Sequence, residues 1–160
     1  MKVYRSVEGC AFAFAFVAVL SLPANALAGR CSSVSVAPLN FGSSISPGGI
    51  AVTIKSATAI SVNCSVGTKF VLLLGEGSNA IGSGFGAVRR LAGAGGYLPY
   101  GLFQDGARTM PWGDGMNVGN GEAGSGNAGA EPFIVFSSLS IPATAVGGSY
   151  SDSVLVTVSF

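Results

Sequence analysis

The sequence predicts an exported, all-β domain that forms an antiparallel sandwich or barrel stapled by one disulfide. Three observations support this fold class. The chain begins with the pattern of an export signal, and no later stretch keeps a helical period. Instead, short segments of alternating apolar and polar residues are separated by glycine-rich turns.

Residues 1–28 are predicted to be a cleaved signal peptide. Lys2 and Arg5 precede an apolar run at 11–20, and the small-residue pattern Ala26-Leu27-Ala28 follows it. The run is shorter than the roughly 20 apolar residues that a membrane anchor needs. We therefore expect a cut after Ala28, which leaves one mature domain at 29–160 without stable membrane insertion.

The cysteine count changes when the signal is removed. Cys10 leaves with it, so Cys31 and Cys64 remain alone in an exported chain. An intramolecular disulfide is then the default, with two free thiols or an intermolecular bridge as the alternatives. On the chain-entropy model such a bond stabilises the fold by about 3–4 kcal/mol.

The charge balance of the mature domain gives no sign of a charged partner. Of the 8 Lys+Arg residues two leave with the signal, and of the 7 Asp+Glu residues one leaves, so 6 of each remain. No basic or acidic cluster survives, so neither nucleic acid nor an anionic membrane surface is predicted as a partner. A nearly neutral surface also permits self-association.

The predicted strands follow in order along the mature chain. An extended segment at 34–41 comes first, and the continuous apolar run at 70–74 is expected to be a central strand. The final strand has the clearest alternation, with Val154, Val156, Val158 and Phe160 on one face. The other predicted strands lie at 52–54, 60–66, 97–103 and 133–141, with the last at 149–160. Stretches 75–96 and 113–129 are glycine-rich and predicted mostly irregular, and the second is expected to bury no core.

The sequence offers little catalytic apparatus. It contains no histidine, so Ser/His/Asp and Cys/His constellations are impossible. Asp105, Asp114, Glu122 and Glu131 are the candidate paired carboxylates, but most of them adjoin glycine in turn-like sequence. We therefore predict that the protein is not an enzyme.

Cofactor and metal sites are not predicted either. The strand at 70–74 runs into a G-x-G-x-x-A pattern at 75–80, yet the glycine-rich 81–86 would not hold the helix that a dinucleotide needs. The 114–122 loop carries oxygen ligands, although it lacks the acidic ladder of a calcium loop.

Four pieces of the chain together resemble the spore coat U family, which includes pilin subunits of the archaic chaperone–usher (Csu-type) pathway. The resemblance covers nearly all of the mature chain. The pieces are Cys31 with 36–42, then 60–64, then 100–109 leading to 112–115, and finally 147–158.

The resemblance implies an incomplete immunoglobulin-like sandwich that lacks its last strand. A groove beside the final strand, with Val154, Val156, Val158 and Phe160, would then accept a strand from a periplasmic chaperone. A donor strand of a neighbouring pilin subunit would replace it at the outer-membrane usher. The family's paired cysteines map onto Cys31 and Cys64, joining the first two strands. Arg108, Trp112, Tyr150 and Asp152 match family motifs and are interpreted as structural.

One departure from the family concerns the N-terminus. Only Gly29 and Arg30 would precede Cys31, so the subunit would accept a strand but have none to give. We expect a structural subunit of a surface fibre, in the periplasm during transit and then at the cell surface. The missing donor segment favours a position at the tip. The alternative is a secreted or coat-type adhesive module, whose surface is formed by the loops 75–96 and 113–129 and exposed aromatics such as Trp112. A lone mature chain is expected to be unstable.

Overall fold

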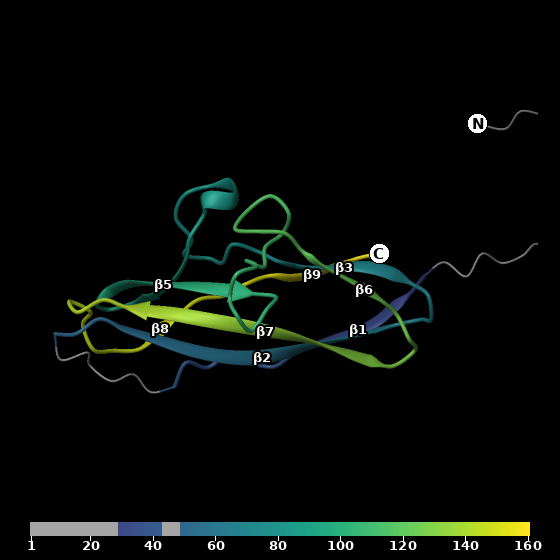
Figure 1. The fold of residues 1–160 in the computed structure, drawn as a ribbon, viewed down its shortest axis with the longest axis horizontal. Coiled ribbons are helices and arrows are strands. Elements are labelled where there is room, and N and C mark those ends of the chain that lie inside the picture. The colour runs from purple at the N-terminus through teal and green to yellow at the C-terminus, as the bar shows by residue number, and fades with distance from the viewer. Residues whose placement is uncertain (1–28, 43–48) are drawn as a thin grey trace, which may run out of the picture.

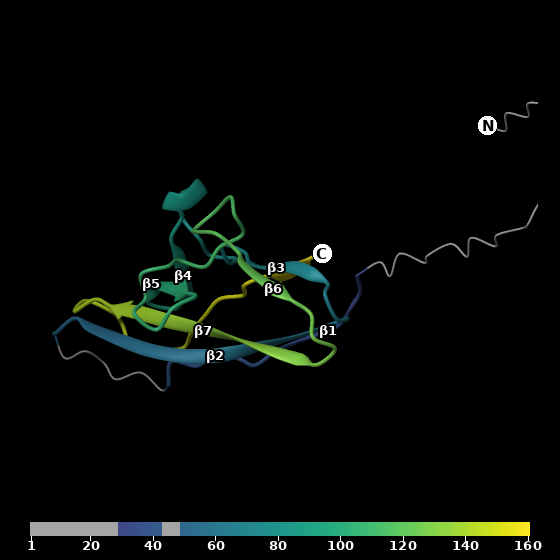
Figure 2. The same ribbon diagram turned by 45° about the vertical axis from the view of Figure 1, so that its right-hand side comes forward.

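A computed structural model describes residues 29–42 and 49–160 of the chain. The predicted signal peptide at 1–28 lies outside the described residues. Two antiparallel sheets pack against each other, and in the described part of the chain the helical content is one 3-10 turn, η1 (Gly84–Gly86). Figures 1 and 2 show the two layers, with β2 and β7 in one and β3 and β6 in the other. The all-β prediction is confirmed.

The larger sheet has six strands and is built around one long antiparallel pair. β2 (Val52–Cys64) and β7 (Ala130–Ile141) stay in register from Val52 opposite Ile141 to Asn63 opposite Ala130. The full order is β1 (Cys31–Val36), β2, β7, β5 (Gly96–Phe103), β4 (Arg89–Gly93) and β8 (Tyr150–Ser151). β1 is therefore an edge strand.

The smaller sheet has three strands in the order β6 (Glu122–Ser125), β3 (Lys69–Leu74) and β9 (Val156–Ser159). β3 lies in the middle, as predicted from its continuous apolar run. Leu72 and Leu74 point into the core, while Val71 on the opposite face is partly exposed. β9 is an edge strand like β1.

The core lies between the inward faces of the two sheets. Ile60 and Val62 of β2 meet Phe70 and Leu72 of β3 because alternate residues of each strand point to the same face. Trp112 is fully buried with them, and its indole N–H donates to the carbonyl oxygen of Leu72 at 2.9 Å. This hydrogen bond satisfies the polar end of an otherwise apolar side chain.

Two predicted irregular stretches contain strands. β4 lies within 75–96 and pairs with both β5 and β8, and β6 lies within 113–129 and pairs with β3. The stretch 113–129 adds no apolar side chain to the core, yet it is not wholly irregular, because β6 within it pairs with β3. Neither Arg-Arg-Leu-Ala-Gly nor Glu-Ala-Gly-Ser alternates apolar and polar residues, so pairing with strong neighbouring strands decides their conformation.

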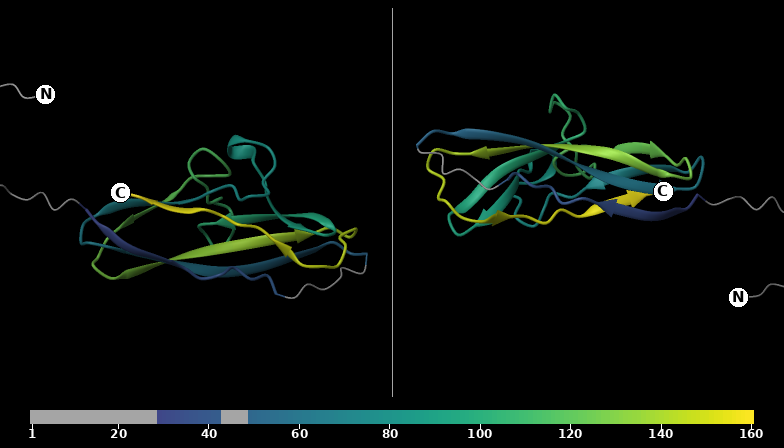
Figure 3. Two further views of the ribbon diagram at one scale, coloured as in Figure 1. Left: turned by 180° about the vertical axis from the view of Figure 1, so that it is seen from behind. Right: turned by 90° about the horizontal axis from the view of Figure 1, so that it is seen from below.

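The last predicted strand is divided between the two sheets. β8 pairs with β4 in the larger sheet, whereas β9 pairs with β3 in the smaller one. Residues 152–155 cross between them. Val154 therefore lies in the crossing, and Phe160 follows the end of β9 with 64% of its surface exposed. Seen from behind and from below, the yellow β9 and the purple β1 lie along the same side of the molecule (Figure 3).

Candidate functional site

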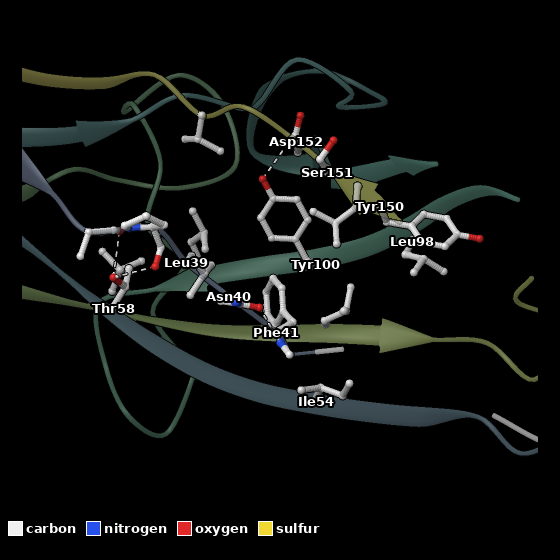
Figure 4. Close-up of a pocket in the computed structure, with 18 of the residues that line it drawn as sticks. Leu39, Asn40, Phe41, Ile54, Thr58, Leu98, Tyr100, Tyr150, Ser151 and Asp152 are labelled. Atoms are coloured by element: carbon white, nitrogen blue, oxygen red, sulfur yellow. Dashed lines mark hydrogen bonds between the residues drawn. The ribbon is translucent and has the colours of Figure 1, made fainter. Parts of the chain in front are cut away.

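An apolar cleft of about 800 Å³ opens between the two sheets on the side of β1 and β9. Figure 4 shows side chains from the 37–42 segment, from β2 and β5, and from the crossing after β8 pointing into it. The cleft exposes part of the core to solvent. Its walls include Val36, Ile54, Leu98, Tyr100, Leu139 and Val156.

The wall formed by β1 is apolar but uncovered. Val34 lies opposite Val62 and Val36 lies opposite Ile60, so all four side chains share the inward face of the sheet. Ile60 and Val62 are 1% exposed, whereas Val34 and Val36 are 43% and 49% exposed. The apolar side chains of β1 therefore face the core, and no described residue covers them fully.

The wall formed by β9 has the same character. Val156 lies opposite Leu74 and Val158 opposite Leu72, again on the inward face. Both leucines are buried, while both valines are only partly buried against the core. Of the predicted groove residues, Val154 and Val156 line the cleft and Val158 lies on the same face one step along β9.

Phe160 does not join these three valines. It lies in a separate shallow depression with Gly29 and Lys69. This placement gives no support to the prediction that Phe160 belongs to the groove. Phe160 follows Ser159, the last paired residue of β9, so the alternation of the strand no longer fixes the direction of its side chain.

The backbone of β9 also has an unpaired side. The Gly75 N–H donates to the Leu155 carbonyl oxygen at 2.9 Å, which makes Gly75–Leu155 a hydrogen-bonded pair. Because such pairs alternate along an antiparallel ladder, the N–H and C=O groups of Val156 and Val158 point away from β3. No other described strand pairs with that side.

The same reasoning applies to β1. The Ala37 N–H donates to the Ala59 carbonyl oxygen at 3.2 Å, so the backbone groups of Val34 and Val36 point away from β2. The cleft is thus bordered by two strand edges whose inward side chains are apolar and whose outer backbone groups pair with no other strand of the described part of the chain.

The segment 37–42 leaves the β1 ladder and lies on the inner side of β2. Two inward-facing hydroxyls of β2 hold it: Thr58 donates to the Ala37 carbonyl oxygen at 2.9 Å and Ser56 to the Asn40 carbonyl oxygen at 2.8 Å. The ring of Pro38 restricts its φ to about −65°, away from the usual strand value, and the β1–β2 pairing ends before it. The segment carries Leu39 and Phe41 into the cleft (Figure 4).

Asp152 anchors the crossing between the sheets, beside the cleft. Its carboxylate accepts hydrogen bonds from the Tyr100 hydroxyl at 2.7 Å and from the backbone and side-chain nitrogens of Asn79 at 3.2 and 2.9 Å. Burial, together with the hydrogen bond to Asp152, raises the pKa of Tyr100 well above its ordinary value. The Tyr100 hydroxyl therefore remains a donor at all physiological pH values.

The other three motif residues also make hydrogen bonds within the domain. Arg108, at φ 63°, donates to the Ser137 carbonyl oxygen at 2.9 Å, and the Tyr150 hydroxyl donates to the Val146 carbonyl oxygen at 2.7 Å. Trp112 is 0% exposed. The prediction that Trp112 is an exposed adhesive aromatic was therefore wrong: its side chain fills the core below β3.

Arg89 is a buried residue that the sequence did not single out. It is 0% exposed, and its guanidinium donates to the Leu74 carbonyl oxygen at 2.8 Å and to the Gly75 carbonyl oxygen at 2.6 and 2.9 Å. Its Nη1 has no partner among the described residues. Burial lowers the pKa of Arg89, opposed by the nearby Tyr100 and by more distant acidic groups. Arg89 ties β4 of the larger sheet to the end of β3.

A disulfide joins Cys31 and Cys64, as predicted. The two residues lie opposite each other at the start of the β1–β2 pair. The bond therefore fixes the strand that forms one wall of the cleft.

The candidate carboxylates do not form a common site. Asp105 accepts hydrogen bonds from the N–H groups of Met110 and Thr109, which lower its pKa, and Asp114 caps a second turn in the same way. Burial raises the pKa of Glu122 on β6. Across the described residues, no group of three or more acidic, cysteine or histidine side chains is placed to hold a metal ion.

The two glycine-rich loops lie together and project from the sandwich (Figure 1). We call residues 77–88 and 113–121 the knob. The Gly84 N–H donates to Asn117 Oδ1 and the Val118 N–H to the Gly84 carbonyl oxygen, both at 3.0 Å. Val118 has a φ of 65°, which is rare for a β-branched residue. Phe85 and Met116 are 60% and 72% exposed on this knob.

The chain matches the model of the Spore Coat Protein U domain family over residues 16–157 and belongs to that family. A comparison with curated proteins finds no match.

The chain is also similar to a solved structure. This is the crystal structure of the CsuC–CsuE chaperone–tip adhesion subunit pre-assembly complex from archaic chaperone–usher Csu pili of Acinetobacter baumannii. The sequence identity is 22% and the TM-score is 0.52, over 82% of this chain and 40% of that one. The fold predicted from the family resemblance, an incomplete immunoglobulin-like antiparallel sandwich with one disulfide, is confirmed.

Proposed function

We propose that this protein is a structural subunit of a chaperone–usher surface fibre, assembled by insertion of a strand from another chain between β1 and β9. The observation that carries the proposal is the pair of open edges. Val34, Val36, Val156 and Val158 all face the core, remain partly exposed, and turn their backbone groups toward the gap. An inserted strand would gain main-chain hydrogen bonds and would bury its alternate apolar side chains.

Family membership and the solved neighbour support this assignment. The neighbour is a complex of a chaperone with a pilus tip subunit. By analogy, a periplasmic chaperone fills the cleft first and a strand of a neighbouring subunit replaces it at the outer-membrane usher. The chain would then pass through the periplasm to the cell surface. Within residues 29–42 and 49–160 there is no helix of sufficient length and apolar character to cross a membrane.

The position in the fibre depends on the mature N-terminus. The family match extends upstream over residues 16–28, which the sequence assigns to the signal peptide. A cut after Ala28 leaves a subunit without a donor segment, as expected at a tip, whereas a start near residue 15 would supply one and contradict the tip position. Mass spectrometry of the exported chain distinguishes the two.

The function is tested by adding a synthetic peptide of alternating valine and threonine to the exported chain and following thermal unfolding. At a hundredfold excess over Kd, binding to the folded state adds about 2.7 kcal/mol. The melting temperature should rise by roughly 10 °C. A peptide with the same composition but with its valines in one block is the control, because it cannot place them all on one face.

The proposal would be contradicted by a chain that melts as a stable monomer and whose melting temperature neither peptide changes. The fold would then be closed without a partner strand.

A second candidate function, an adhesive contact, is favoured by the knob. We propose it because the two loops hold each other in place while exposing Phe85 and Met116. Residues 77–88 carry no charged side chain and 113–121 carry only Asp114, whose carboxylate is hydrogen-bonded within its own loop. Exposed apolar side chains without charges favour contact with an apolar, uncharged surface. The knob and the cleft share no residue, so both functions are compatible in one subunit.

A further inference from the structure

The sandwich has a second side with unpaired strand edges, at the end of the smaller sheet away from β9. β6 pairs with β3 alone, and β5 pairs with β7 only over 136–139, so residues 130–135 of β7 pair with β2 alone. Figure 2 shows β6 leading through the turn 126–129 into the first residues of β7. In the described part of the chain, both edges therefore lack a strand beside them. We call this the β6–β7 side.

The core is covered at the β6–β7 side, in contrast to the cleft. Phe133 and Val135 of β7 are 6% and 3% exposed. The Phe133 ring packs edge-on against Phe70 of β3, with the ring centroids 5.7 Å apart and the planes at 71°. Both rings fill the space beneath Gly124 of β6, where an added Cβ would overlap them. A strand added here would therefore meet a filled core and not an apolar cavity.

Two glutamates point inward along these edges. Glu122 of β6 lies opposite Leu72, and Glu131 of β7 lies opposite Val62. Leu72 and Val62 are buried on the inward faces of their sheets, and residues directly opposite each other share a face. The Oε2 atom of each glutamate is buried and has no hydrogen-bond partner among the described residues. Burial raises the pKa of Glu122, because the charged form loses its hydration.

This arrangement costs stability, since a buried carboxylate oxygen without a partner loses its hydration and gains no hydrogen bond. An apolar side chain at either position would extend the core. Inward-pointing charges on edge strands are, however, a means of preventing edge-to-edge pairing. An added strand would cover the charge and place its own apolar side chains beside it. The two carboxylates thus lie where they oppose such pairing most directly.

We propose that Glu122 and Glu131 keep the β6–β7 side from accepting a strand, so that the chain takes one strand and takes it between β1 and β9. The two open sides differ in their inward side chains, which are valines on one side and carboxylates on the other. The inference rests on the proposed function where it concerns an inserted strand. Protection of the same edges against a second copy of this chain does not depend on that function.

The test counts the alternating valine–threonine peptides bound to each exported chain by native mass spectrometry. The wild type should bind one. The double variant Glu122→Val and Glu131→Val should bind a second peptide at least about tenfold more tightly than the wild type does, because the penalty of covering an unpaired carboxylate is gone. Without peptide, sedimentation velocity should show dimers of the double variant and monomers of the wild type.

The matched control is Ala123→Val, which adds a valine to the same strand on its exposed outer face and should leave one bound peptide and a monomer. Adding Val156→Asn to the double variant separates the two sites, since it should weaken the peptide between β1 and β9 and spare the second one. If the double variant fails to fold, each single valine variant should show a smaller shift in the same direction.

The outcomes separate this inference from the proposed function. If the wild type binds one peptide and the double variant also binds one and stays monomeric, or if the wild type binds two, exclusion by the glutamates is wrong and the proposed function stands. If no peptide binds to the wild type, the proposed function fails. Dimers of the double variant would then still support protection of the β6–β7 edges, and monomers would contradict it.

Discussion

At the scale of single residues, the least expected feature is a buried arginine that has no carboxylate as a hydrogen-bonding partner. The guanidinium of Arg89 is hydrogen-bonded to two backbone carbonyl oxygens at the end of β3. Gly75 directly follows β3: its N–H donates to the Leu155 carbonyl oxygen, whereas its own carbonyl oxygen accepts hydrogen bonds from Arg89. Arg89 therefore satisfies carbonyl groups that lie between the two sheets and have no ladder partner.

We expect Arg89→Met to lower the free energy of unfolding by about 1–3 kcal/mol, because it leaves two buried carbonyl groups unsatisfied. Arg90→Met is the matched control. Arg90 makes one hydrogen bond, to the Asn79 carbonyl oxygen, and lies over the partly exposed ring of Tyr97, so its loss should cost less than about 1 kcal/mol. Urea unfolding of both variants measures the difference. Equal losses of unfolding free energy in the two variants would show that the buried hydrogen bonds of Arg89 stabilise the fold no more than the partly exposed contacts of Arg90.

Single residues also show where sequence reasoning reached its limit. The pairing of Cys31 with Cys64 could be predicted because they are the two cysteines that lie outside the predicted signal peptide. The burial of Trp112 and Arg89 could not, because both lie beside glycine-rich sequence that resembles exposed loop. Both side chains are hydrogen-bonded to the end of β3, at separations of 14 to 40 residues, so no local pattern indicates their burial.

At the scale of elements, β9 is a strand with two different sides. Val156 and Val158 point inward, while Thr157 and Ser159 point to solvent and pair their backbone groups with β3. This division predicts which side chains an inserted strand contacts.

We expect Val156→Asn to weaken binding of the alternating peptide by at least about tenfold, because burial of an unpaired amide costs about 1–3 kcal/mol. Thr157→Asn should leave binding within about twofold, since Thr157 is exposed on the outer face of the same strand. Peptide titration measures both. A loss of affinity in the Thr157 variant equal to that in the Val156 variant would contradict the assigned direction of the side chains.

The strands that sequence alone predicted are those with strong alternation or a continuous apolar run. β3, β5 and most of β7 fall into this group, together with both ends of β2 and the second half of β1. β4, β6 and β8 are short or rich in glycine and serine, and they form only because a stronger strand lies beside them. The division of the last strand between two sheets was missed for a related reason: alternation continues through 152–155, although Asp152 bonds there to Tyr100 and Asn79 rather than to a strand.

At the scale of the whole molecule, the knob and the cleft are separate surfaces on one sandwich. The knob consists of 77–88 and 113–121. The strand pairing next to it determines which changes to the knob leave the sandwich intact. Removing all of 113–129 would delete β6, which pairs with β3, and would damage the smaller sheet. Substitutions confined to the exposed side chains avoid this.

We therefore expect the double variant Phe85→Ser and Met116→Ser to reduce attachment to alkyl-coated beads by about tenfold, as the loss of two exposed apolar side chains implies. Binding of the alternating peptide should be unchanged in the same variant. The control is Val66→Ser, which removes an exposed valine located outside the knob. Unaltered attachment of the double variant would exclude the knob as an adhesive surface.

The crossing of residues 152–155 also has a kinetic consequence. β3 and β9 pair with each other although all the strands from β4 to β8 lie between them in the chain. During synthesis β3 is therefore complete long before β9. The smaller sheet therefore forms completely only when β9, one of the last described segments, pairs with β3. This pairing joins distant parts of the chain. Such long-range pairing makes folding slow, so β3 stays unpaired on one side until β9 reaches it. A partner that meets the chain during this interval encounters an unfinished sheet as well as an open cleft.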